Sequence, residues 1–306
     1  EDNFKITTWP YRGGDSLCLI NFFGEYILNI NDCEINSAED SKKVLFEINK
    51  KTSKIDFLLT QFGYACWNGN EDEKELRVKA AQEKLTAMEN QIKVFKPSCI
   101  IPFASFIFFS NDKNFYINNE QNKVSSIREH SYLGSLENIY FLKPLAEFDI
   151  LNVEKNDLRK KSKIAEKHYS NLYNKIKPII GADPNELNEK EIIEISLKYL
   201  KTINNSFLHL FSLKKLNIRI LIEDVNKVLE LDYSKKPKLD SMSFFDLKMT
   251  SDTLSFILNN LFGFNTIHVS GVFRVNSSKS ISKAEAFFWP QSLLKFGFGI
   301  KKPVST

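Results

Sequence analysis

The segment Ile55–Gln61 reads IDFLLTQ, and the segment Ser98–Phe109 reads SCIIPFASFIFF. Nearly continuous apolar runs are typical of strands that are buried on both faces of a sheet. The residues between them, Glu71–Lys96, repeat apolar side chains at spacings of three and four, which predicts an amphipathic helix that Pro97 ends. A strand, a long helix and a second strand form a right-handed crossover, so we expect the two strands to be parallel neighbours.

Two further strands and a short helix are predicted before this crossover. The strands are Asp15–Phe23 (DSLCLINFF) and Tyr26–Ile30 (YILNI), and the helix is Ala38–Asn49. After the crossover, the polar, asparagine-rich stretch Asn111–Val124 predicts a surface loop, and Ile139–Leu142 predicts a last short strand. The first half of the chain is therefore predicted to be an α/β fold.

The composition changes after residue 152, and we expect three regions: 1–152, 153–205 and 206–306. The middle region is predicted to be a basic helical linker, because Lys155–Lys177 is rich in lysine and arginine. Such a helical face is usually solvated, so we favour a surface helix over a phosphate or nucleic-acid site. A second helix is expected to begin at Pro184.

The last region is predicted to be an α+β unit with an antiparallel sheet. Its expected strands are Asn217–Asp224, Val225–Asp232, Phe244–Met249 and Phe264–Val275. Its expected helices are a short one capped by Ser251 and a terminal one over Ser282–Phe296, which Pro290 is expected to kink or break.

The composition excludes several classes of protein. The 306 residues are 42% hydrophobic and 26% charged, unlike a disordered or a membrane protein. No stretch reaches the roughly 18 consecutive apolar residues that cross a bilayer. With 42 Lys+Arg against 38 Asp+Glu, the net charge of +4 does not indicate a nucleic-acid partner. The four cysteines form no C-x-x-C pair, so we expect free thiols and a cytoplasmic location.

Polar residues follow three of the expected strands. Asp32 follows Tyr26–Ile30, Gln61–Tyr64 follows the next strand, and Pro102–Ser105 interrupts the third apolar run. Ligands in open α/β sheets bind beyond the carboxyl ends of the strands, so we expect these loops to open at one edge. An aspartate in that position is either a metal ligand or a turn or capping residue, and the pattern alone leaves both roles open.

Four elements in this order resemble the C-terminal half of the metallo-β-lactamase fold. They are DSLCLINFFGEYILNINDC (15–33), IDFLLTQFGYACWNG (55–69), the long helix, and KPSCIIPFASFIFFSNDKNFYI (96–117). The chain looks most like the branch that includes CMP-N-acetylneuraminate hydroxylase and related bacterial metallo-hydrolase-like proteins. This resemblance implies the C-terminal half of an αββα sandwich, followed by an α+β accessory domain.

The resemblance implies that Asp32 is a ligand of a divalent metal ion. The metal would be zinc, with iron and manganese as alternatives, and most of its ligands would lie outside this chain. The H-x-H-x-D-H motif of the fold is absent from the sequence. We expect that motif in an N-terminal half upstream of Glu1, or on a partner chain. Such an enzyme uses metal-activated water to attack an ester, amide or phosphoester of a small molecule.

The substrate pocket of such an enzyme would be lined by side chains of the same loops: Gln61, Tyr64, Trp67 and Phe103. The resemblance also implies an alternative, an iron-dependent hydroxylase of a sugar nucleotide, which would need a redox partner. A third alternative is a non-catalytic interaction subunit that kept the fold and lost the site. In that case the basic helix would bind a protein partner.

The four histidines are scattered at His130, His168, His209 and His268, so no local motif of this chain builds a multi-histidine metal centre. We interpret His130 as a loop residue, His168 as a surface residue, His209 as a core residue and His268 as part of a strand. The sequence also lacks a P-loop and a G-x-G-x-x-G motif, so neither nucleotide-binding signature is present.

Overall fold

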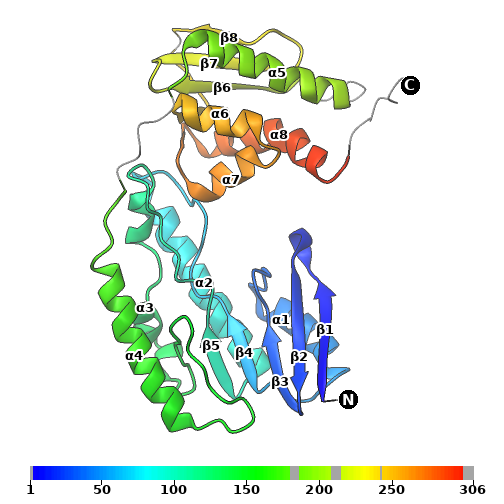
Figure 1. Cartoon of the computed structure of the whole chain (residues 1–306), viewed down its shortest axis with the longest axis vertical. Helices are drawn as coiled ribbons and strands as arrows, with labels where there is room; N and C mark the ends of the chain where they lie inside the picture. The colour runs from blue at the N-terminus through cyan, green and yellow to red at the C-terminus, as the bar shows by residue number, and fades with distance from the viewer. Residues whose placement is uncertain (1–2, 180–185, 208–214, 242, 299–306) are drawn as a thin grey trace. The chain divides into compact units, whose positions relative to one another are not determined.

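The computed structural model describes residues 3–179, 186–207, 215–241 and 243–298. The chain divides into two compact units (Figure 1). Unit 1 comprises Glu1–Phe108 and Ile117–Lys177, and unit 2 comprises Phe109–Tyr116 and Pro178–Thr306. Each unit combines helices with one five-stranded mixed sheet, which confirms the predicted α/β class.

The sheet of unit 1 has five strands in the order in which they occur in the chain. They are β1 (Phe4–Pro10), β2 (Ser16–Phe22), β3 (Glu25–Asn29), β4 (Phe57–Thr60) and β5 (Cys99–Pro102). The pairs β1–β2 and β2–β3 are antiparallel, whereas β3–β4 and β4–β5 are parallel (Figure 1). The predicted crossover is confirmed, because β4 and β5 are parallel neighbours joined by a long helix.

Two helices supply side chains to the core on one face of this sheet. α1 (Ala38–Asn49) begins after Ser37, whose hydroxyl accepts a hydrogen bond from the backbone N–H of Asp40 at 3.0 Å. α2 (Lys74–Phe95) ends at Lys96, which adopts a left-handed backbone conformation with φ 49°. The bounds of α1 match the prediction, whereas α2 begins three residues after the predicted start at Glu71.

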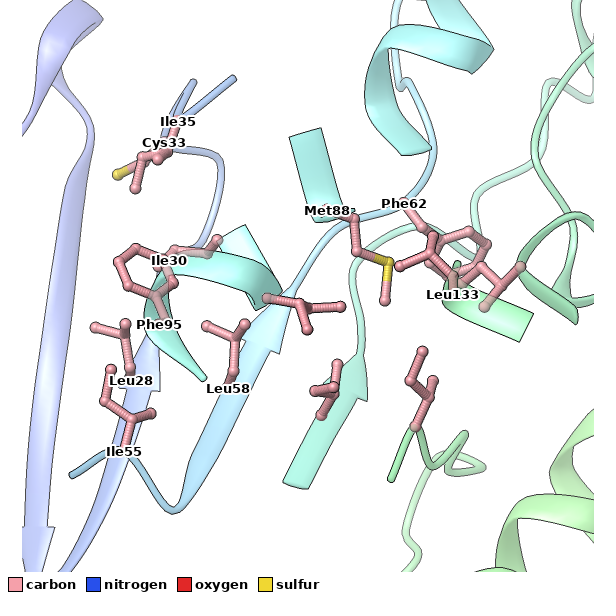
Figure 2. Packing of buried hydrophobic residues seen from close by; sticks show 14 of the residues in the cluster. Leu28, Ile30, Cys33, Ile35, Ile55, Leu58, Phe62, Met88, Phe95 and Leu133 are labelled. Atoms are coloured by element: carbon pink, nitrogen blue, oxygen red, sulfur yellow. The ribbon is translucent and has the colours of Figure 1, made fainter. Parts of the chain in front are cut away.

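The core between the helices and the sheet is built mainly from aliphatic side chains. Leu28, Leu58 and Ile100 form one row across β3, β4 and β5, and all three are fully buried. Met88 and Phe95 of α2 belong to the same cluster, and Figure 2 shows Phe95 beside Leu28 and Leu58. The burial of this apolar surface is the main favourable contribution that holds α2 on the sheet.

The opposite face of the sheet is covered unevenly. At β4 and β5, Phe57 and Ile101 pack with Tyr140 in a second buried cluster. At β1, the side chains of Phe4 and Ile6 are 58% and 53% exposed. The ring of Phe4 packs edge-on against that of Phe22, and more than half of Phe4 and of Ile6 remains exposed, which makes this end of the sheet a candidate contact surface.

The remaining helices of unit 1 are α3 (Val124–Glu129) and α4 (Lys155–Tyr173). Short 3-10 turns lie at Arg12–Gly14, Phe115–Asn119 and Leu133–Ser135. α4 is the predicted basic helix, and it is more than a solvated face, because Ala165 and Tyr169 are buried in the core beside the sheet. Its charged side chains alternate with residues that anchor it to unit 1.

Two predictions for the segment after β5 are wrong. The stretch Asn111–Val124 is not a plain surface loop, because the side chains of Gln121 and Asn122 are buried. Ile139–Leu142 is largely buried but forms no strand, and one isolated bridge joins it to Ile100 of β5. A short apolar run marks burial, and in this case it does not produce a backbone ladder.

Unit 2 has a sheet in the strand order β10-β9-β6-β7-β8. Its strands are β6 (Asn217–Ile222), β7 (Lys227–Asp232), β8 (Lys238–Asp240), β9 (Leu247–Met249) and β10 (Arg274–Val275). Its helices are α5 (Glu189–Phe207), α6 (Ser251–Asn259), α7 (Gly263–Ser270) and α8 (Ser278–Lys295). β6 and β9 are parallel, so the prediction of an antiparallel sheet is wrong for this pair.

The segment Phe264–Val275, predicted as a strand, is mostly helical. It contains all but the first residue of α7, and only its last two residues form β10. The ring of Phe264 stacks on that of Phe288 in α8, with ring centroids 4.7 Å apart. The predicted break at Pro290 is also absent, because α8 continues through this residue to Lys295.

The predicted cap of α6 is wrong. Thr250 rather than Ser251 caps α6, because the hydroxyl of Thr250 accepts a backbone hydrogen bond from the first turn. The hydroxyl of Ser251 donates to the carboxylate of Asp224 instead. The predicted helix start at Pro184 lies outside the described residues, and α5 begins at Glu189.

The core of unit 1 gives a direct test of how α2 is held on the sheet. Leu58→Ala should lower the free energy of unfolding by about 2–5 kcal/mol, because it leaves a cavity between β4 and α2. Leu76→Ala is the control on α2, since Leu76 is 48% exposed and its truncation should change stability by no more than about 0.5 kcal/mol. Chemical denaturation measures both, and equal losses would contradict the packing described.

Candidate functional site

Three loops leave the carboxyl ends of β3, β4 and β5, and the parallel pairing brings them together. The side-chain amide of Gln61, after β4, donates a hydrogen bond to Oδ1 of Asp32, after β3. The hydroxyl of Ser105, after β5, accepts hydrogen bonds from the backbone N–H groups of Phe62 at 2.9 Å and Gly63 at 3.1 Å. The expected common edge, called the carboxyl edge below, is therefore confirmed.

Asp32 lies in a turn at the carboxyl edge, and the residue is exposed to solvent. The residue before it, Asn31, has a left-handed backbone conformation with φ 43°, and its N–H donates to Oδ1 of Asn29 at 2.9 Å. Asp32 is therefore a turn aspartate whose carboxylate is accessible. Within the described parts of the chain, no group of three His, Cys, Asp or Glu side chains is placed to hold a metal ion.

The other predicted pocket residues differ in how they can meet a ligand. Tyr64 is 2% exposed, and its hydroxyl donates a hydrogen bond to the carbonyl oxygen of Ile117 at 2.9 Å. Trp67 and Phe103 are partly exposed. The backbone N–H of Phe103 bonds to the carbonyl oxygen of Thr60 at 3.0 Å, which continues the parallel pairing into the loop. The hydroxyl of Tyr64 is therefore committed to holding the loop.

Buried amides that the sequence did not single out fix the loop after β4. Nδ2 of Asn122 donates to the carbonyl oxygens of Phe62 and Ala81, both at 2.7 Å. Nε2 of Gln121 donates to the carbonyl oxygen of Tyr64 at 3.2 Å. Because Ala81 belongs to α2, a single side chain connects the loop to the helix. The one feature of the sequence that could have indicated these buried amides is the asparagine-rich stretch after the third apolar segment.

A second link runs through α2 to the loop after β3. The hydroxyl of Thr60 donates to Oε1 of Gln91 at 2.5 Å, and Nε2 of Gln91 donates to the carbonyl oxygen of Ile35 at 2.8 Å. All three residues are buried. Gln91 therefore joins the end of β4 to the loop that carries Asp32, so α2 supports two of the three loops at the carboxyl edge.

A buried ion pair fastens the segment that carries these amides. Nε of Arg77 lies 2.8 Å from Oε2 of Glu120, and both side chains are less than a tenth exposed. Arg77 also donates to the carbonyl oxygens of Asn70 and Glu71. These additional hydrogen bonds help to offset the free-energy cost of desolvating the guanidinium group. The ion pair alone would not compensate that cost.

A cleft of about 730 Å³ lies between α2 and the loops after β3 and β4. The side chains that matter for its chemistry are Glu34, Tyr64, Cys66, Asn68, Lys79 and Lys84. Asp32 does not line this cleft. The cleft contains both carboxylates and ammonium groups, so its character is that of a polar binding site.

Cys66 is a free thiol in this cleft, and the other three cysteines are also free, as predicted. Burial raises the pKa of the Cys66 thiol, and the carboxylate of Glu34 raises it further. A hydrogen bond from Nδ2 of Asn68 to Sγ (3.5 Å) and the charge of Lys84 lower it. Because burial is the largest effect, Cys66 is a protonated wall residue and not an activated nucleophile.

Three histidines lie within the residues that the structure describes. Nδ1 of His130 accepts a hydrogen bond from the backbone N–H of Leu133 at 3.3 Å, in the loop that was expected. His268 lies in α7 and not in a strand, so that interpretation is wrong, and burial lowers its pKa. His168 packs its ring near that of Tyr169 in α4. His209 lies outside the described residues.

No protein-family model matches the sequence, and no curated protein matches it. Among the described helices, none is both long and apolar enough to cross a membrane.

The amide of Asn122 gives a test of how the loop after β4 is held. Asn122→Ala leaves two buried carbonyl oxygens without this donor, so we expect a loss of about 1–3 kcal/mol in the free energy of unfolding. Asn119→Ala is the matched control, because Asn119 is exposed in the same segment. Denaturation curves of both variants measure the difference, and an Asn122→Ala protein as stable as the control would rule out the proposed anchor.

The environment of Cys66 predicts its reactivity towards an alkylating agent. Burial disfavours the thiolate and raises its pKa, so the alkylation rate of Cys66 should rise with pH at a higher midpoint than that of a cysteine in a short peptide. Asn68→Ala should move the midpoint higher still, because the amide stabilises the thiolate. Mass spectrometry of the Cys66 peptide follows the rate, and a midpoint below the peptide value would contradict this account.

Proposed function

We propose that unit 1 is the C-terminal half of a metallo-β-lactamase sandwich and forms one edge of a metal-dependent hydrolase site. The observation that carries the proposal is the position of Asp32, an exposed carboxylate at the carboxyl end of β3. Its Oδ1 accepts a hydrogen bond from the side chain of Gln61, which lies in the loop after β4, the parallel neighbour of β3. Metal-binding carboxylates are commonly oriented by such outer partners.

The residues of this chain fit only part of a metal site. Asp32 offers one oxygen ligand, and the described residues hold no group of three ligands. The proposal therefore assigns the remaining ligands to a histidine-bearing N-terminal half of the fold or to a partner chain. Zinc is the favoured metal, with iron or manganese as alternatives, and such an ion lowers the pKa of a bound water that attacks an ester, amide or phosphoester.

The exposed apolar side chains at the β1 end of the sheet are a second observation in favour of the proposal, because they leave room for a partner layer. Phe4 and Ile6 of β1 are more than half exposed, whereas Phe57 and Ile101, on the same face at the other end of the sheet, are buried. A second sheet packed on this face would remove the exposed apolar surface from water. An αββα sandwich supplies such a layer, which agrees with a completing half of the fold.

The chain's own residues would position a small-molecule substrate at this edge. Gln61 orients the carboxylate of Asp32 through its amide. Tyr64 keeps the loop after β4 in place, because its hydroxyl is bonded to the carbonyl oxygen of Ile117. The partly exposed rings of Trp67 and Phe103 are available to contact the substrate.

The test is the metal content and hydrolytic activity of the complete protein, with this chain joined to the histidine-bearing half. Asp32→Asn should remove stoichiometric metal and activity, because it replaces an anionic ligand with a neutral amide. Gln61→Ala should weaken metal affinity by roughly 10–100-fold, as loss of an outer partner does. Glu71 is an exposed carboxylate between β4 and α2, and Glu71→Gln should change neither the metal content nor the activity.

Other outcomes separate the alternatives. Complete wild-type protein that holds no stoichiometric metal when purified without chelator would falsify the hydrolase proposal. Iron together with an oxygen-dependent product would favour the hydroxylase of a sugar nucleotide. Full activity of Asp32→Asn in the cell, with assembly lost after charge reversal in α4, would favour the non-catalytic interaction subunit.

A further inference from the structure

The cleft between α2 and the loops carries a second site that does not use Asp32. Its volume of about 730 Å³ is within the usual range for small-molecule pockets. Its walls come from α2 on one side and from the loops after β3 and β4 on the other. The same hydrogen bonds that fix these loops, through Asn122 and Gln91, keep the walls of the cleft in place.

Two charged side chains of the cleft have no ion-pair partner among the residues that the structure describes. Lys84, partly buried on α2, is one, and Glu34, on the loop after β3, is the other. By contrast, Lys79 and Glu83 on the same helix pair with each other at 3.8 Å. A partly buried ammonium group without a counter-ion is costly unless something compensates its charge.

Lys84 and Glu34 lie on different walls of the cleft, one on α2 and the other on the loop after β3. The thiol of Cys66 senses the ammonium group of Lys84 and the carboxylate of Glu34, which shift its pKa in opposite directions. Both effects on the pKa of Cys66 agree with charged groups that line the same cleft as this thiol. The cleft is therefore lined by one positive and one negative group that have no ion-pair partner in the part of the chain that the structure describes.

We propose that this cleft binds a free amino acid in its zwitterionic form, with the carboxylate on Lys84 and the ammonium group on Glu34. A ligand with a single charge compensates only one of these side chains, whereas a zwitterion compensates both. The walls also carry the uncharged polar side chains of Asn36, Asn68, Gln82 and Thr86, which match a ligand whose own side chain is polar and uncharged. L-Glutamine is the probe with these properties.

This site is independent of the proposed hydrolase. Neither Lys84 nor Glu34 is assigned to the metal, and the cleft binds its ligand without one. Calorimetry of the full chain with L-glutamine in the presence of EDTA therefore tests the cleft alone. Asp32→Asn should leave this binding unchanged, so failure of the hydrolase proposal and failure of this one are distinguishable.

The charged walls are tested with two variants and two altered ligands. Lys84→Gln and Glu34→Gln should each weaken L-glutamine binding at least about tenfold, as expected for loss of one charge-assisted contact. Lys74→Gln, an exposed lysine of α2 outside the cleft, is the control and should bind like the wild type. Glutaminamide lacks the carboxylate, so its affinity for the wild type should be lower than that of L-glutamine. For the Lys84→Gln variant, the affinities of glutaminamide and L-glutamine should be equal.

N-Acetylglutamine lacks the ammonium group, so its affinity for the wild type should be lower than that of L-glutamine. For the Glu34→Gln variant, the affinities of the two ligands should be equal. Bound L-glutamine should also slow alkylation of Cys66 relative to Cys18, which lies outside the cleft. Absence of L-glutamine binding to folded wild-type chain overturns the proposal. Binding that both wall variants leave intact overturns it as well, as does equally tight binding of glutaminamide and L-glutamine to the wild type.

Discussion

The parallel pairing of β3, β4 and β5 is the constraint on which the rest of unit 1 depends. Parallel neighbours place their carboxyl ends at one edge, so three loops that are far apart in the sequence meet there. The hydrogen bond between Gln61 and Asp32, and those from Phe62 and Gly63 to Ser105, exist only because of this register. The candidate site and the cleft are both consequences of it.

Sequence reasoning was most successful where periodicity and end signals agreed. The bounds of α1 correspond to the prediction, since Ser37 caps its start and its apolar positions keep helical spacing. β4 and β5 were found because both are apolar runs separated by a long helix. At the site, the strand-end rule was sufficient to bring Asp32, Gln61 and Ser105 to one edge without any knowledge of their contacts.

The failures have identifiable physical causes. Ile267, His268 and Val269 have side chains that suit a strand, but packing of Phe264 on Phe288 holds the segment as a helix, so tertiary contacts override local propensity. Asn122 was assigned to a surface loop because its composition is polar. Its partners lie 60 and 41 residues away, and no local pattern encodes contacts of that separation.

The amide of Asn122 also has a consequence for the order in which the molecule gains structure. Its two hydrogen bonds close long loops of chain, and the entropy cost of this closure favours their formation after α2 has docked on the sheet. The sheet core can therefore be complete while the loop after β4 still samples other conformations. We therefore expect the amides of Phe62 and Gly63 to exchange through a local opening that is easier than global unfolding.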